Sequence, residues 1–117
     1  MKYFCLTLTM PNDEPLIQEY IERHRAVWPE VLQSFVTAGV INMELYRKDN
    51  LMVMLLVTED DFTFERKAQL DLSNPIVMQW EAQMAKYQGA DPTTDASARW
   101  KPLELFFSMQ DQIKGLL

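Results

Sequence analysis

The chain has 117 residues, of which 48% are apolar, and its 17 acidic and 11 basic side chains give it a net charge of −6. This length favours a single domain over residues 1–117 with one hydrophobic core. The acidic balance argues against nucleic acid and anionic membrane as partners, because clustered Lys and Arg hold both. One cysteine and one histidine exclude an internal disulfide framework, a multi-cysteine zinc site and a histidine-rich metal cage.

The amino-terminal residues do not have the charged, apolar and small-residue regions of a signal peptide. No apolar run approaches the roughly 20 residues that a membrane-spanning helix needs. We therefore expect a cytoplasmic protein that has no membrane partner.

The first half of the chain predicts a strand followed by a helix. Apolar and polar residues alternate over 3–9, which is typical of a half-buried strand. Apolar residues then recur at steps of three and four over 16–35 and predict one amphipathic helix. Pro29 should break or kink that helix, and Gly39 should end it as a left-handed cap.

The second half predicts a hairpin, two helical pieces and a last strand. The hairpin strands are 40–46 and 51–57, the helical pieces are 59–70 and 75–88, and the last strand is 103–109. The order βαββαβ predicts an α+β, ferredoxin-like fold. In this fold a four-stranded antiparallel sheet carries both helices on one face.

The strand over 51–57 is apolar on both faces, and such a strand must be covered on both. The helices cover one face of the predicted sheet and leave the other bare. A second copy of the chain is the simplest cover, so we predict a homodimer with a barrel-like interface.

His24 is the centre of the functional prediction. It follows Tyr20 by four residues and precedes Trp28 by four, which would place all three on one side of the predicted helix. An imidazole, a phenol and an indole together suit a sugar, which offers hydroxyls for hydrogen bonds and C–H faces for aromatic contact. The alternative is a core histidine bonded to a backbone carbonyl. On the second helix, Trp80 and Glu81 could reach the same cavity, or could be a core tryptophan beside a solvated carboxylate.

The segment from Tyr20 to Glu30 resembles the Tyr-x-x-x-His-x-x-x-Trp-Pro-Glu segment of the L-rhamnose mutarotase family. The similarity continues in order along nearly the whole chain. It implies a small dimeric α+β barrel that needs no metal or cofactor and interconverts the α and β anomers of a 6-deoxy sugar. By position, His24 would be the proton donor and Tyr20 would contact the sugar. Trp28 and Trp80 would form an apolar wall near the sugar's methyl or C–H face.

Two positions depart from the family's pattern. Met43 stands where the family has a second sugar-contacting tyrosine, and Glu81 stands where it has the second of two adjacent tryptophans. Both positions bear on which sugar is bound, so L-fucose is a rival to L-rhamnose. The catalytic base is left open between Glu81 and water.

Two other functions compete with catalysis by a mutarotase. A binding or regulatory domain of the same shape would use the cavity only to recognise a sugar. A cofactor-free monooxygenase on a similar barrel would act on an electron-rich aromatic substrate and consume oxygen.

Overall fold

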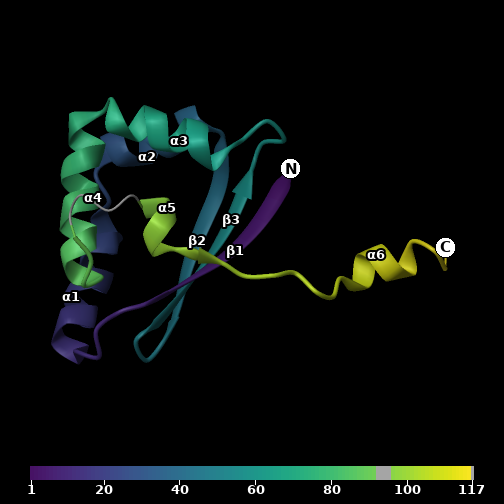
Figure 1. Cartoon of the computed structure of the whole chain (residues 1–117), viewed down its shortest axis with the longest axis horizontal. Helices are drawn as coiled ribbons and strands as arrows, with labels where there is room; N and C mark the ends of the chain where they lie inside the picture. The colour runs from purple at the N-terminus through teal and green to yellow at the C-terminus, as the bar shows by residue number, and fades with distance from the viewer. Residues whose placement is uncertain (92–95, 117) are drawn as a thin grey trace.

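The chain folds into a four-stranded antiparallel sheet with helices on one face, as the computed structural model shows for residues 1–91 and 96–116 (Figure 1). The strand order is β2-β3-β1-β4, which confirms the predicted α+β, ferredoxin-like arrangement. Within the described residues, no helix is long and apolar enough to cross a membrane. The elements in chain order are β1 (Lys2–Thr9), α1 (Glu14–Arg23), η1 (His24–Ala26, a 3₁₀ turn), α2 (Pro29–Ala38), β2 (Val40–Lys48), β3 (Leu51–Thr58), α3 (Phe64–Leu72), α4 (Pro75–Tyr87), α5 (Ala96–Arg99), β4 (Lys101–Pro102) and α6 (Met109–Ile113).

The first helical region is interrupted, as Pro29 predicted. Helix α1 ends at Arg23, η1 follows, and α2 starts afresh at Pro29 after an extended Trp28 with φ −59° and ψ 136°. Proline disfavours helical geometry in the residue before it and cannot donate a backbone hydrogen bond, so the two helices cannot join. Gly39 caps α2 in the left-handed region at φ 96°. His24 therefore lies at the end of α1, and Trp28 lies beyond the break.

The second helical region begins later in the chain than the sequence predicts. Helix α3 begins at Phe64, five residues after the predicted Glu59, because Thr63 is the cap whose side chain accepts from the backbone N–H of Arg66. Helix α4 begins at Pro75, as predicted, and its cap is Asn74.

The hairpin of β2 and β3 gives the sheet one buried and one uncovered face. Met52 and Leu56 are buried under the helices, whereas Leu55 is exposed on the other side. The strand register places Tyr3 and Tyr46 on the same outer face as Leu55. Helices α1 to α4 all lie on the inner face (Figure 1), so the outer face meets none of them.

The predicted last strand over 103–109 is wrong. Pairing with β1 extends only over β4 and one further bond, from the N–H of Leu103 to the carbonyl of Cys5 at 2.8 Å. The chain then leaves the sheet and runs away from the domain to α6 (Figure 1). Phe106 is 92% exposed and Leu105 is 78% exposed. The apolar pattern predicts a buried strand, but no surface of the described residues covers Leu105 or Phe106. We call residues 103–108 the carboxy-terminal arm.

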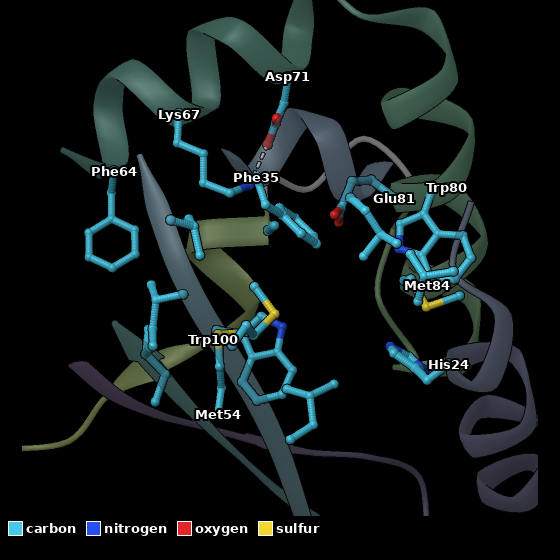
Figure 2. Close-up of a pocket in the computed structure, with 18 of the residues that line it drawn as sticks. His24, Phe35, Met54, Phe64, Lys67, Asp71, Trp80, Glu81, Met84 and Trp100 are labelled. Carbon is cyan, nitrogen blue, oxygen red and sulfur yellow. Dashed lines mark hydrogen bonds and ion pairs between the residues drawn. The ribbon is translucent and has the colours of Figure 1, made fainter. Parts of the chain in front are cut away.

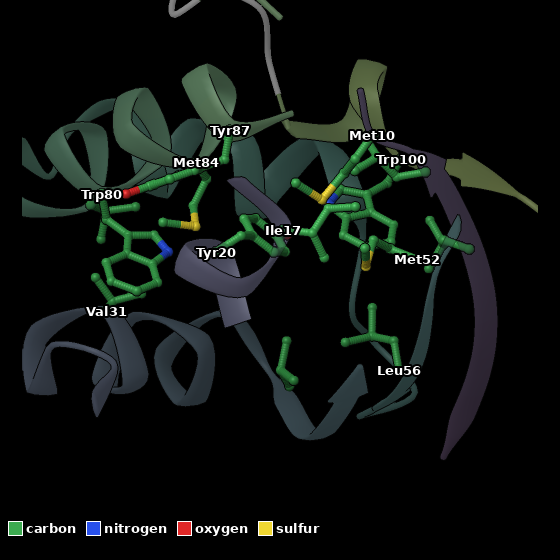
Figure 3. Packing of buried hydrophobic residues seen from close by; sticks show 14 of the residues in the cluster. Met10, Ile17, Tyr20, Val31, Met52, Leu56, Trp80, Met84, Tyr87 and Trp100 are labelled. Atoms are coloured by element: carbon green, nitrogen blue, oxygen red, sulfur yellow. The ribbon is translucent and has the colours of Figure 1, made fainter. Parts of the chain in front are cut away.

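The core fills the space between the helices and the inner face of the sheet (Figure 3). Helices α1, α2 and α4 contribute Ile17, Val31 and Val77 to this core, and these side chains are almost wholly excluded from solvent. Tyr20 and Trp80 belong to the same core and also border a cavity. The cavity walls are therefore held by the packing that stabilises the fold.

Candidate active site

A cavity of about 590 Å³ lies between the helices and the inner face of the sheet. Most of its walls are apolar, with contributions from Phe35, Met54 and Trp100 among others (Figure 2). A mainly apolar cavity with a few polar groups is the usual form of a small-molecule site. The polar and charged side chains on its walls are Tyr20, His24, Asn42, Lys67, Asp71, Glu81 and Gln88.

The imidazole of His24 is fixed by one hydrogen bond and two aromatic neighbours. Its Nδ1 donates to the backbone carbonyl of Tyr20 at 2.8 Å, so Nδ1 carries a proton. The ring centroid lies 4.6 Å from that of Tyr20 and 5.7 Å from that of Trp80. A core histidine would make the same carbonyl bond, but this ring also lines the cavity. Its Nε2 is left to accept a proton in the neutral form or to donate one in the cation.

A chain of polar side chains connects Tyr20 with Glu81. The Tyr20 hydroxyl accepts from the Gln88 amide at 3.1 Å, and the Gln88 carbonyl oxygen accepts from the Arg99 guanidinium. A second nitrogen of Arg99 donates to Oε2 of Glu81. The side chain of Arg99 is only 3% exposed, so these two partners replace part of its lost hydration, while Nε is buried without a partner among the described residues.

Burial raises the pKa of the Tyr20 phenol above its ordinary value, and the hydrogen bond from Gln88 opposes this effect in part. The phenol therefore keeps its proton at neutral pH. Because its oxygen accepts from Gln88, that proton remains available for a ligand.

A second charged pair lines the cavity from α3. Lys67 donates to Oδ2 of Asp71 at 2.7 Å, and both side chains are largely buried. The ammonium group also lies 5.4 Å from the centre of the Phe35 ring. Oδ1 of Asp71 is buried and has no hydrogen-bond partner among the residues that the structure describes.

The structure brings most of the predicted site residues to one cavity, which His24, Tyr20, Met43, Trp80 and Glu81 all line. Trp28 is placed elsewhere, because the break before Pro29 removes it from the face that carries His24. Its ring packs against Trp80, with centroids 5.3 Å apart, and borders a smaller outer pocket.

Sequence reasoning missed Gln88, Arg99, Lys67 and Asp71. The last two are four residues apart, a spacing that could have indicated an ion pair on α3. No local pattern marks Arg99, because its partner Glu81 lies 18 positions away on another element.

The raised pKa of Tyr20 predicts a specific loss of stability in alkali. Between the unfolded and the folded pKa, the unfolded chain releases the phenol proton while the folded chain retains it, so stability falls as pH rises through this window. We expect the free energy of unfolding of wild type to fall more steeply than that of Tyr20→Phe as pH rises from about 9 through the ordinary tyrosine pKa of about 10 and above it. Urea unfolding at several pH values measures this difference. Equal slopes would contradict the buried phenol.

Comparison with known proteins identifies a family of enzymes. A model of the family L-rhamnose mutarotase matches residues 3–109. The L-fucose mutarotase of Xanthomonas campestris pv. campestris is 31% identical over 115 residues, which cover 97% of this chain and 92% of that protein. A UPF0734 protein of Dictyostelium discoideum is 25% identical over 115 residues, covering 92% of this chain and 90% of that protein.

Solved structures share the fold. An L-rhamnose mutarotase from Formosa agariphila superposes with a TM-score of 0.70 at 21% identity, covering 93% of this chain and 99% of that one. The tetracenomycin F2 cyclase of Streptomyces glaucescens gives a TM-score of 0.58 at 21% identity, covering 92% of this chain and 96% of that one. The family match and the mutarotase relative confirm the expected enzyme class, an isomerase acting on sugar anomers. The chain belongs to the L-rhamnose mutarotase family.

Proposed function

We propose that this protein interconverts the α and β anomers of a 6-deoxyhexose, and that His24 is its proton donor. One observation carries the proposal: His24 is held through Nδ1, while its ring lines a cavity with Tyr20 and Trp80. Nε2 is thereby the nitrogen that can exchange a proton with a ligand. Membership of the L-rhamnose mutarotase family supports the reaction type.

Anomer interconversion needs only the transfer of protons. His24 donates a proton to the ring oxygen of the sugar and the C1–O5 bond opens, while the anomeric hydroxyl gives its proton to a base, either Glu81 or water, and C1 becomes a carbonyl carbon. Rotation about C1–C2 turns the other face of the carbonyl toward O5, and reclosure returns the proton to His24. Side chains supply these proton transfers without a cofactor.

The other predicted site residues would hold the sugar. Tyr20 offers a hydroxyl proton, Trp80 an aromatic face, and Met43 an apolar surface, while Glu81 offers a carboxylate. Trp28 would act indirectly, because its ring packs against the ring of Trp80 and supports it. The apolar walls favour a methyl group at C5, since each buried CH₂-sized group contributes about 0.8 kcal/mol. The family name points to L-rhamnose and the relative from Xanthomonas campestris to L-fucose.

The working protein in this proposal is a homodimer of single-domain chains, located in the cytoplasm, whose remaining partner is the sugar. The outer face of the sheet supports the dimer, because Leu55, Tyr3 and Tyr46 share that face and are exposed. The carboxy-terminal arm supports it too, since Phe106 and Leu105 are apolar and project from the domain. A second copy would cover both surfaces.

The dimer makes a prediction about mass in solution. We expect Leu55→Asp to convert a dimer into a folded monomer, because a carboxylate in the interface would be buried without a partner, whereas in the free monomer it meets water. Size-exclusion chromatography with light scattering measures the mass. Leu72→Asp is the control, since Leu72 is an exposed leucine at the end of α3. A monomeric wild type would overturn the dimer.

Saturation-transfer NMR on free sugars tests the activity. The protein should speed exchange between the anomeric signals of L-rhamnose, L-fucose or both. Their 6-hydroxy counterparts, L-mannose and L-galactose, should exchange at least about 10-fold more slowly, because the apolar wall would desolvate the added hydroxyl. Sugar binding without faster exchange would instead indicate a recognition domain, and oxygen uptake with an aromatic substrate would indicate a monooxygenase.

A further inference from the structure

Glu81 presents one anchored and one free carboxylate oxygen to the cavity. Its Oε2 accepts from the guanidinium of Arg99. Among the side chains that the structure describes, none donates a hydrogen bond to its Oε1. The side chain is 20% exposed and lines the cavity, and Figure 2 shows its carboxylate directed into the same space as the His24 ring.

The anchoring by Arg99 fixes the direction of the carboxylate. Arg99 donates to Glu81 through one nitrogen and to Gln88 through another, and its side chain is 3% exposed. A guanidinium is always charged, so it supplies a permanent counter-charge for a carboxylate in a partly buried place. The free oxygen is thus held in position before any ligand arrives.

The other candidate bases of the cavity are less suited to take a proton. Tyr20 is buried, its pKa is raised, and it therefore stays neutral at neutral pH. Asp71 has its Oδ2 bonded to Lys67, and its Oδ1 has no accessible surface. Among the described carboxylates of the cavity wall, Glu81 combines an unbonded oxygen with a side chain that is 20% exposed, whereas the unbonded oxygen of Asp71 is buried.

We propose that Glu81 is the second acid–base group of the anomer exchange, acting on the anomeric hydroxyl while His24 acts on the ring oxygen. This inference rests on the proposed function. In ring opening, Oε1 of Glu81 takes the O1 proton, the O1–H electrons form the C1=O bond, and the C1–O5 electrons take the proton from Nε2 of His24. Reclosure on the other face of the carbonyl reverses both transfers, so neither a net proton nor an oxidant is required.

The variant Glu81→Gln tests this role with little change of shape. Glutamine still offers Arg99 an oxygen but cannot take the proton, so the exchange rate at saturating sugar should fall about 10²-fold or more. Sugar affinity, measured by ligand titration, should change by less than about threefold, because the lost proton transfer stabilises the transition state and not the bound sugar. Glu65→Gln, an exposed glutamate in the first turn of α3, is the matched control and should keep the wild-type rate.

Restoring activity with an added carboxylate distinguishes proton transfer by Glu81 from a purely structural role. In Glu81→Ala, formate can enter the vacated space and take the proton, so it should restore exchange at least about 10-fold, while leaving the rate of His24→Ala unchanged. Circular dichroism verifies the fold of each variant.

The outcomes separate the two proposals. A wild type that exchanges no sugar overturns the proposed function and this inference with it. An active wild type, with an inactive His24→Ala and a fully active Glu81→Gln, overturns the role of Glu81 alone. A Glu81→Gln variant with weaker binding but an unchanged rate at saturation makes Glu81 a sugar contact, and also overturns its acid–base role.

Discussion

Replacing His24 with alanine is expected to slow catalysed anomer exchange by about 10²- to 10⁴-fold. The physical reason is the loss of Nε2, which is the ring nitrogen left free by the bond from Nδ1 to the Tyr20 carbonyl. The fold should survive, because His24 is only partly buried and lies at the end of α1. Saturation-transfer NMR at matched protein concentration gives the rate.

The variant His24→Asn separates catalysis from support of the backbone. Its side-chain amide can still donate to the Tyr20 carbonyl but cannot carry a proton to the sugar. A catalytic role predicts that the asparagine variant is as slow as the alanine variant. An asparagine variant that retains the wild-type rate would make His24 a structural residue bonded to a carbonyl.

Replacing Trp80 with alanine is expected to lower the free energy of unfolding by about 3–5 kcal/mol. The indole is 4% exposed and contacts the rings of Trp28 and His24. Its removal leaves a cavity in the core and takes away one of the two aromatic neighbours of the imidazole. This loss is a large share of the stability of an ordinary domain, which is about 5–15 kcal/mol. Urea unfolding measures it.

A matched core variant shows whether Trp80 also serves the site. Phe62 is 1% exposed and does not itself line the cavity; it packs against Phe4 and against Phe64, which is a wall residue. Phe62→Ala should lose a similar amount of stability but keep the exchange rate per folded molecule. Trp80→Ala should lose both, because the aromatic wall and the support of His24 disappear together. Equal rates per folded molecule in the two variants would contradict a role of Trp80 in the site.

The sequence predicts the first three strands and the helix break because these depend on local patterns. Alternation over β1, the two strands of the hairpin, and the backbone limits of Pro29 are each visible within a few residues. The position of Trp28 could not be predicted from its spacing to His24, since a four-residue step places two side chains on one face only when the helix is continuous.

The carboxy-terminal arm and the partners of Arg99 could not be predicted for a different reason. Alternating apolar residues over 103–109 predict a buried strand of this domain, whereas β4 is short and Leu105 and Phe106 are exposed beyond it. The partners of Arg99 come from α4 and from the residue that follows it, and only the folded chain brings them together. Local sequence motifs therefore could not predict the chain of hydrogen bonds from Tyr20 through Gln88 and Arg99 to Glu81.

One measurement tests most directly whether His24 makes this protein an anomer-exchange catalyst. The rate of exchange between the anomeric signals of L-rhamnose and L-fucose is followed by saturation transfer as protein concentration rises, for wild type and His24→Ala side by side. We predict a rate that grows linearly with wild-type concentration for at least one sugar and hardly rises with the variant. Equal slopes for the two proteins, or no slope for wild type on either sugar, would contradict the account.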